Sequence, residues 1–332
     1  MCLAGGGCAG SLTADDATSI DVRTELLVFR GADGTPAAWS HLLGAVADAD
    51  VIIVGEEHGN AVGHRVELAI VQDVLDRWPG SALSMEMLDR TEQAVVDDYL
   101  ADFIDLETFQ ERTAGTRWLK ISRQYVDGEI NRKTFEKRIT RLGWPDWETN
   151  YQPIIDAARS AGAPVIAANT PWLVYSSVAR REGFERLDDV TPAQRALFEV
   201  PAEIPQGTYR ERFWDVMVGR AEGEPPPEDG DADEDSAHSD LDDETVAAMF
   251  RGQLVMDATM AESIATASRA GAPKVVHLVG HFHCDFEGGL VQELRRRLPE
   301  AEILVITALA RDEPALRDED VDRADFVVYT KR

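Results

Sequence analysis

Short apolar stretches alternate along this chain with longer segments in which apolar residues recur every three or four positions. The short stretches are rich in Val, Ile and Leu, which is typical of strands buried on both faces of a parallel sheet. The predicted strands are residues 26–29, 51–54, 82–87, 163–169, 275–279, 303–307 and 326–329. The longer segments predict helices at residues 39–47, 61–77, 91–113, 172–181, 209–218, 245–270 and 290–298. This alternation predicts a three-layer α/β/α fold with a mostly parallel, mixed sheet, and extra helices outside it in residues 116–150.

The strand at 51–54 runs directly into Gly55, where the backbone can turn, and then into Glu56, Glu57 and His58. Core packing does not call for two carboxylates and an imidazole at the end of a buried strand. In open α/β sheets, ligands bind beyond the carboxyl ends of the strands. The alternative is a solvated loop whose charges have no function.

The strand at 275–279 has the same pattern, because Gly280 follows it and His281 and His283 come next. Four of the seven histidines, namely His58, His277, His281 and His283, lie at these two strand ends. If the two strands are neighbours in the sheet, both Gly-x-x-His elements face one crevice. This recurrence favours a functional site over chance polar loops.

Glu86 lies in the otherwise apolar strand 82–87. A carboxylate in such a place must be paired, bound to a metal, or at the strand end. We therefore expect His58, Glu86 and His283, with Glu56 or Glu57, to converge and bind a divalent ion. Imidazole and carboxylate ligands suit zinc, manganese or iron better than calcium. A free carboxylate beside an open metal position could act as the base for a bound water, which outlines a hydrolase mechanism.

The net charge of −28 argues against binding to a nucleic-acid backbone, which needs a basic surface. Part of this charge is local, because residues 222–244 hold twelve Asp and Glu and no Lys or Arg. With three consecutive prolines and almost no apolar residue, residues 221–244 predict a disordered acidic insertion. The rest of the chain, residues 21–332, is expected to form a single domain.

Residues 1–20 predict a flexible tail. Small residues precede Cys8, and a polar, acidic run follows it, which resembles the end of a bacterial lipoprotein signal. The expectation is a lipid anchor on Cys8, with the body in the periplasm or at the outer membrane. No later segment has the apolar length needed to cross a bilayer, so contact with the membrane is expected only through this anchor.

Four separated motifs together resemble the ChaN-like haem-binding uptake family, which belongs to the Tiki and erythromycin-esterase-like superfamily. The motifs are Gly55-Glu56-Glu57-His58, Ala168-Asn169-Thr170-Pro171, Gln253-x-x-x-Asp257-x-x-Met260-Ala261, and Gly280-x-x-His283 before Gly288-Gly289-Leu290. They occur in the right order over residues 25–310. The resemblance implies a bacterial, iron-linked lipoprotein that holds haem through an axial Tyr, with paired haems across a homodimer.

Tyr209 is the residue that we expect to ligate haem iron, with His58 and His283 organising the pocket. The Tiki branch implies instead a metal-dependent hydrolase, with Glu57 and Glu86 as its catalytic residues. Its metal ligands would come from His58, Glu56, Glu86, His281 and His283. A surface-anchored interaction protein with a vestigial site is the third hypothesis. The helix that carries Gln253 and Asp257 favours the haem-binding reading.

Overall fold

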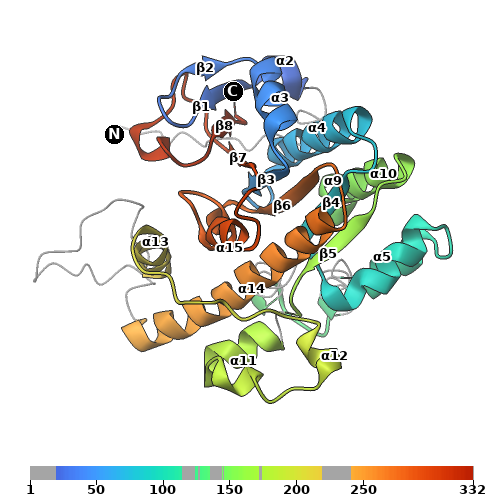
Figure 1. Cartoon of the computed structure of the whole chain (residues 1–332), viewed down its shortest axis with the longest axis vertical. Coiled ribbons are helices and arrows are strands. Elements are labelled where there is room, and N and C mark those ends of the chain that lie inside the picture. The colour runs from blue at the N-terminus through green and yellow to red at the C-terminus, as the bar shows by residue number, and fades with distance from the viewer. Residues whose placement is uncertain are drawn as a thin grey trace, which may run out of the picture.

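An eight-stranded sheet is the centre of the computed structural model (Figure 1), with strand order β2-β1-β8-β7-β3-β6-β4-β5. The structure describes residues 20–113, 124–125, 128–134, 144, 146–171, 174–218 and 241–331. The strands are β1 Leu27–Arg30, β2 Pro36–Ala37, β3 Val51–Glu56, β4 Ala82–Asp89, β5 Val165–Asn169, β6 Val275–Gly280, β7 Ile303–Leu309 and β8 Phe326–Tyr329. Pairing is parallel from β5 through β8, whereas β1 runs antiparallel to β8 and β2. The predicted α/β fold with a mixed, mostly parallel sheet is therefore confirmed.

The central strands β3 and β6 are direct neighbours, and β6 also pairs with β4. Glu56, the last residue of β3, lies beside Gly280, the last residue of β6. Because parallel strands end at the same edge, the two Gly-x-x-His elements and Glu86 of β4 come together at the carboxyl edge of the sheet.

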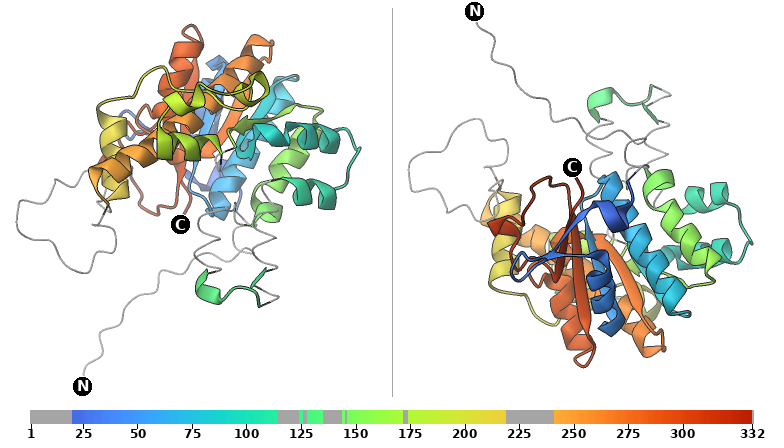
Figure 2. Two further views of the ribbon diagram at one scale, coloured as in Figure 1. Left: turned by 90° about the horizontal axis from the view of Figure 1, so that it is seen from below. Right: turned by 90° about the horizontal axis from the view of Figure 1, so that it is seen from above.

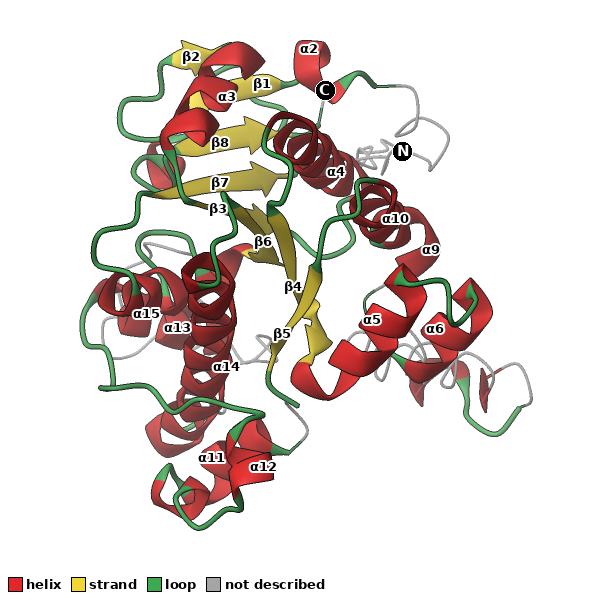
Figure 3. Cartoon of the chain, turned by 45° about the vertical axis from the view of Figure 1, so that its right-hand side comes forward, coloured by secondary structure: helices red, strands yellow, loops and turns green. Residues whose placement is uncertain are grey.

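Helices cover both faces of the sheet, as Figure 3 shows for α4 and α10 on one side and α14 and α15 on the other. The longer helices are α3 Trp39–Asp48, α4 Ala61–Arg77, α5 Gln93–Leu100, α6 Leu106–Arg112, α10 Gln152–Ser160, α11 Tyr175–Glu182, α13 Thr208–Met217, α14 Asp243–Arg269 and α15 Gly289–Arg297. The short ones are α2 Val22–Glu25, α9 Trp147–Asn150 and α12 Pro192–Arg195, with the single turns η1 Arg90–Glu92, η2 Glu185–Leu187, η3 His281–His283 and η4 Asp318–Asp320. Within the described ranges, no helix is both long and apolar enough to cross a membrane.

The alternation along β3 divides the core into two clusters, because successive side chains of a strand point to opposite faces. Ile52 and Val54 pack in the cluster that contains the apolar residues of α3, α4 and α10. Val51 and Ile53 pack in the cluster formed with α14 and α15. Glu56 therefore points to the α4 face of the sheet.

Asn60 fixes the start of α4 directly after the β3 loop. Its side chain accepts a hydrogen bond from the Gly63 N–H, and its amide donates to Thr330 Oγ1 at 2.8 Å. An Asn at this position satisfies one of the otherwise unpaired N–H groups of the first turn. The first turn of α4, which includes His64, is thus held against the carboxyl edge of the sheet.

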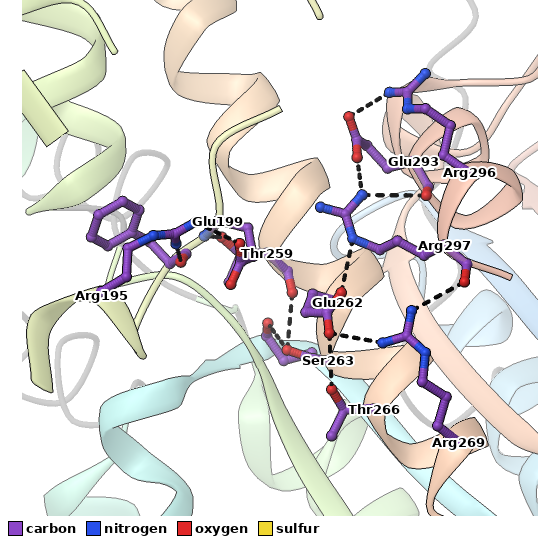
Figure 4. A network of polar contacts seen from close by, with 12 residues as sticks. Arg195, Glu199, Thr259, Glu262, Ser263, Thr266, Arg269, Glu293, Arg296 and Arg297 are labelled. Carbon is purple, nitrogen blue, oxygen red and sulfur yellow. Dashed lines mark hydrogen bonds and ion pairs between the residues drawn. The ribbon is translucent and has the colours of Figure 1, made fainter. Parts of the chain in front are cut away.

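The packing of α15 on α14 is reinforced by a row of ion pairs (Figure 4). Glu262 of α14 pairs with Arg269 at 3.0 Å and with Arg297 of α15 at 3.1 Å. Glu293 pairs with Arg297 and with Arg296. Because several charges share partners, this network holds the long helix more firmly than isolated surface pairs would.

Two predicted helix boundaries are wrong. The helix expected over residues 91–113 is two helices, α5 and α6, separated at Asp102, whose φ is +60°. Asp105 caps the second helix by accepting from the Thr108 N–H at 2.9 Å. α14 begins at Asp243, so the last residues of the predicted acidic insertion are helical. The rest of that insertion, residues 1–19 with Cys8, and most of 116–150 lie outside the described residues.

A buried ion network joins the end of β6 to the β7–β8 edge. The Arg323 guanidinium lies 2.6 Å from Asp285 and 2.9 Å from Asp320, and all three side chains are at most 2% exposed. Asp320 also accepts a hydrogen bond from the Tyr329 hydroxyl at 2.5 Å. Arg311 also lies 3.5 Å from Asp320, and His281 lies 2.8 Å from Asp285. Removing Arg323 would nevertheless leave both buried carboxylates without their closest cation.

We predict that Arg323→Met lowers the free energy of unfolding by about 3–5 kcal/mol, because it removes the closest cation from the buried carboxylates of Asp285 and Asp320. Chemical denaturation followed by circular dichroism measures this. The matched control is Arg295→Met, whose partner Glu287 is 58% exposed; there the expected loss is below about 1 kcal/mol. Equal losses in the two variants would contradict the prediction.

Candidate functional site

His58 stands at the carboxyl edge of the sheet, directly after β3, and its side chain is 45% exposed. Its Nδ1 lies 2.5 Å from Glu56 Oε1. The other edge of the ring lies over Gly280, where an added Cβ would be 3.0 Å from Cε1 and Nε2. Gly280 is therefore needed to leave room for the imidazole. Burial would lower the pKa of His58, but the hydrogen bond and charge of Glu56 outweigh it and raise the pKa.

Glu86 and His283 meet beside this ring. Glu86 Oε2 accepts a hydrogen bond from the Gly280 N–H at 2.7 Å, and Glu86 Oε1 lies 3.4 Å from His283 Nε2. The Asn169 amide donates to the backbone carbonyl of Glu86 at 3.1 Å. We call His58, Glu86 and His283 the carboxyl-edge cluster. The expectation that they converge from three strand ends agrees with this geometry, while their roles stay predictions.

Two residues of α14 contact the His283 ring. Asp257 Oδ1 lies 2.5 Å from His283 Nδ1, and Gln253 Nε2 lies 3.1 and 3.2 Å from the two ring nitrogens. Burial alone would lower the pKa of His283, but Glu86 and Asp257 outweigh it and raise the pKa to about 10. An imidazolium held between two carboxylates is the result.

Tyr209, the predicted haem ligand, lies behind this histidine. Its hydroxyl donates to Asp257 Oδ2 at 2.6 Å, and its side chain is 1% exposed. Burial and the Asp257 carboxylate raise the pKa of Tyr209 well above its ordinary value. A phenolate bond to iron at Tyr209 would require both a break in this hydrogen bond and an opening of the surrounding core.

Two other predicted residues are engaged outside the carboxyl-edge cluster. His281 Nδ1 lies 2.8 Å from Asp285 Oδ2, toward the Arg323 network. Glu57 Oε2 accepts a hydrogen bond from the Ala310 N–H at 2.7 Å, after β7. The structure thus groups His58, Glu86 and His283, and turns His281 and Glu57 toward the β7 side.

Glu56 points away from Glu86 and joins a second group on the α4 face. His64 Nδ1 lies 3.0 Å from Glu56 Oε2 and 2.8 Å from Glu67 Oε2. We call Glu56, His64 and Glu67 the α4 cluster; all three side chains are at most 2% exposed. The Tyr151 hydroxyl donates to Glu56 Oε1 at 2.9 Å.

Protonation in the α4 cluster follows from two carboxylates sharing one buried imidazole. Burial opposes charge on Glu56, but hydrogen bonds from His58 and His64 outweigh it and lower its pKa. Burial and the neighbouring Glu56 carboxylate raise the pKa of Glu67 to about 8. Burial would lower the pKa of His64, yet Glu56 and Glu67 raise it to about 10. At neutral pH the group therefore holds protons where the carboxylates would otherwise repel each other.

Sequence reasoning missed His64, Glu67 and Tyr151. The signal was available for the first two, because they lie between Val62, Val66 and Ile70 on the apolar face of the predicted helix at 61–77. A polar pair on a buried face needs partners. Tyr151 carried no such signal, since it precedes a helix far away in sequence.

Within the described ranges, one group of at least three His, Cys, Asp or Glu brings its ligand atoms within 4.8 Å of one another, and it is the α4 cluster. Only Glu56 is shared with the predicted metal set of His58, Glu56, Glu86, His281 and His283. The carboxyl-edge cluster is looser and opens to solvent at His58. It offers an exposed imidazole beside a buried carboxylate and imidazolium, which suits binding and proton transfer.

A family model described as haem-binding uptake, Tiki superfamily, ChaN matches residues 42–125 and 119–294. No curated protein sequence matches the chain.

Among solved structures, one entitled "Cofacial heme binding to ChaN of Campylobacter jejuni" shares the fold. Its TM-score is 0.56 at 13% identity, covering 92% of this chain and 97% of that one. The type III effector HopBA1 has a TM-score of 0.39 at 15% identity, covering 94% and 99%. An erythromycin esterase EreC mutant in its open conformation has a TM-score of 0.40 at 12% identity, covering 88% and 78%.

We predict that Asp257→Asn lowers the pKa of His283 below its value of about 10, because one of the two carboxylates that hold the imidazolium is neutralised. A raised pKa stabilises the fold below the ordinary value of 6.5 and the effect is lost as pH rises toward 10. The variant should therefore lose less stability than the parent protein across that window.

The measurements are imidazole nitrogen NMR titration and melting temperature against pH, both on metal-free protein. Asp243→Asn, in the exposed first turn of the same helix, is the matched control. An unchanged His283 titration in Asp257→Asn would rule out the proposed support.

Proposed function

Because the chain belongs to the haem-binding uptake family of the Tiki superfamily, ChaN, we propose that it binds haem for iron uptake. The family match spans both Gly-x-x-His elements and the α14 helix, so it includes the whole carboxyl-edge cluster. His58 and His283 organise the pocket in this proposal. By analogy with the cofacial haem of the Campylobacter jejuni protein, we propose that two haems pair across a homodimer.

An axial tyrosine must present its hydroxyl to the iron. Of the six tyrosines of the chain, all within the described ranges, five are buried: Tyr99, Tyr151, Tyr175, Tyr209 and Tyr329. Tyr125 is 38% exposed. Exposure supports Tyr125, rather than the predicted Tyr209, as the axial ligand.

The surroundings of Tyr125 in the sequence support the same assignment. Residues 116–150 contain eight Arg and Lys against five Asp and Glu, in a protein whose net charge is −28. Haem carries propionate carboxylates, which Arg and Lys bind. Its porphyrin face is apolar and aromatic, and Trp144 of the same segment offers it an aromatic ring near His58.

Contact with the carboxyl-edge cluster links this segment to the pocket. The Trp144 ring packs edge-on against His58, with centroids 4.9 Å apart. The short described stretch at 128–134, shown in green in Figure 2, stands away from the sheet on the side where the C-terminus lies. A haem beside His58 and Trp144 would lie at the carboxyl edge, where α/β sheets bind ligands.

We predict that Tyr125→Phe lowers haem affinity by more than about tenfold, since even supporting groups at metal sites are worth that much. Tyr209→Phe should keep the affinity and the Soret band. Haem titration followed by absorption measures both, and sedimentation of haem-loaded protein reports the dimer. If only Tyr209→Phe loses haem binding, Tyr209 is the axial ligand. If both variants keep haem binding, neither tyrosine is the axial ligand.

A metal-dependent hydrolase is the second candidate function. The observation that favours it is the convergence of His58, Glu86 and His283 from three strand ends, with His58 exposed. Glu86 or Glu57 would then act as the base for a metal-bound water. This function requires divalent-metal-dependent hydrolysis that is absent from the His58→Ala/His283→Ala variant and unchanged in Tyr125→Phe.

We further propose that Cys8 is lipidated and anchors the protein to a membrane on the periplasmic side, on the basis of the small residues before it and the polar linker after it. Mass spectrometry of membrane-fraction protein should find a diacylglyceryl group on an N-terminal Cys8. Cys2, also near the start, is the matched control: Cys2→Ser should leave anchoring intact and Cys8→Ser should abolish it. An unmodified Met1 terminus in the soluble fraction would contradict the proposal.

A further inference from the structure

We propose that Glu56, His64 and Glu67 bind one divalent transition-metal ion inside the protein, at a site separate from the haem pocket. The α4 cluster lies on the opposite face of the sheet from Glu86 and His283. It brings together two carboxylates from different elements, β3 and α4, with the imidazole of His64 between them. This inference goes beyond haem binding and does not depend on it.

The spacing of the three groups suits a small ion. His64 Nδ1 lies 2.8 Å from Glu67 Oε2 and 3.0 Å from Glu56 Oε2. Ligand atoms that surround an ion with bonds near 2 Å are themselves about 3 Å apart. A modest widening of this group would therefore admit the ion in place of the proton on Nδ1.

The buried carboxylate oxygens of the α4 cluster have room for a further partner. Glu67 Oε1 is buried and makes no hydrogen bond, and Glu56 Oε2 has only its ion pair with His64 Nδ1. An unsatisfied buried polar atom is costly, and an unsatisfied carboxylate oxygen more so. By contrast, every buried side-chain nitrogen and oxygen of Glu86, Asp257 and His283 has a hydrogen-bond partner. An ion between Glu56 and Glu67 would bind these carboxylate oxygens and neutralise their charge.

Groups around the α4 cluster orient the ligands. The Tyr151 hydroxyl and the His58 ring both hold Glu56 Oε1, which leaves Oε2 facing His64. The His64 ring packs edge-on against the Tyr151 ring, with centroids 4.6 Å apart. Outer groups of this kind fix the ligands of metal sites and tune them.

The donor set narrows the choice of ion. One imidazole and two carboxylates suit Mn²⁺, Fe²⁺ or Zn²⁺, whereas Ca²⁺ prefers oxygen ligands alone and Cu⁺ prefers sulfur. Through the Glu56–His58 hydrogen bond, the charge of the ion would also act on the exposed imidazole of the carboxyl-edge cluster. The proposed site is thus structural, with one contact to the functional edge.

The test uses the full chain, haem-free, refolded with Mn²⁺ or Zn²⁺ because the α4 cluster is buried. Metal is counted by elemental analysis after desalting, and binding of Mn²⁺ is followed by electron paramagnetic resonance. The parent protein should hold close to one equivalent and melt at a higher temperature than its metal-free form. Glu67→Gln and His64→Gln should each weaken binding by more than about tenfold.

Three comparisons keep the test decisive. Metal-free Glu67→Gln should be as stable as the metal-free parent, because it removes one of two apposed carboxylates, so its loss of metal cannot be attributed to unfolding. Glu244→Gln, in the exposed first turn of α14, is the matched control and should bind metal fully. Loss of the metal in Glu86→Gln or His283→Ala but not in Glu67→Gln would move the site to the carboxyl-edge cluster and overturn the proposal. A metal-free parent protein after refolding with either ion would overturn it as well.

Discussion

The Glu56 carboxylate joins the two halves of the site, and the rest of the carboxyl edge depends on it. It closes the central strand, is 1% exposed, and takes contacts from His58, Tyr151 and His64. Burying a carboxylate is costly unless its oxygens find donors. Those donors come from the loop after β3, from α4 and from the start of α10, so the charge of one residue fixes the placement of three elements. A neutral residue here would leave two imidazoles without the anion that orients them.

On the opposite face of the sheet, the buried carboxylates of Glu86 and Asp257 are neutralised by an ion pair with His283. His283 is an imidazolium between Glu86 and Asp257, and the Tyr209 hydroxyl donates a hydrogen bond to the second carboxylate oxygen of Asp257. The carboxyl-edge cluster is therefore already neutralised at its buried end, and its reactive part is the exposed His58. A ligand approaching from solvent would therefore meet His58 first, because its side chain is 45% exposed.

A mostly parallel sheet, and strand ends at the two Gly-x-x-His elements, could be predicted from the sequence, because β-branched runs and their terminal glycines are local signals. Glu86 could likewise be singled out, as a carboxylate inside an apolar strand. The turn at Asp102 was missed because a positive φ at Asp leaves no mark in hydrophobic periodicity. The burial of Tyr209 was also beyond reach, since it depends on contacts with Asp257 and Phe250, more than a helix away in the chain.

The family assignment and the two clusters lead to one consistent chemistry. Under the proposed function, haem iron needs an accessible phenol, and Tyr125 is the tyrosine whose exposure meets that need. His58, between Trp144 and Glu56, connects the carboxyl-edge cluster to the buried α4 cluster. Placing the imidazole at the end of the central strand makes this link rigid, because both Glu56 and Gly280 beneath the ring are held in the sheet.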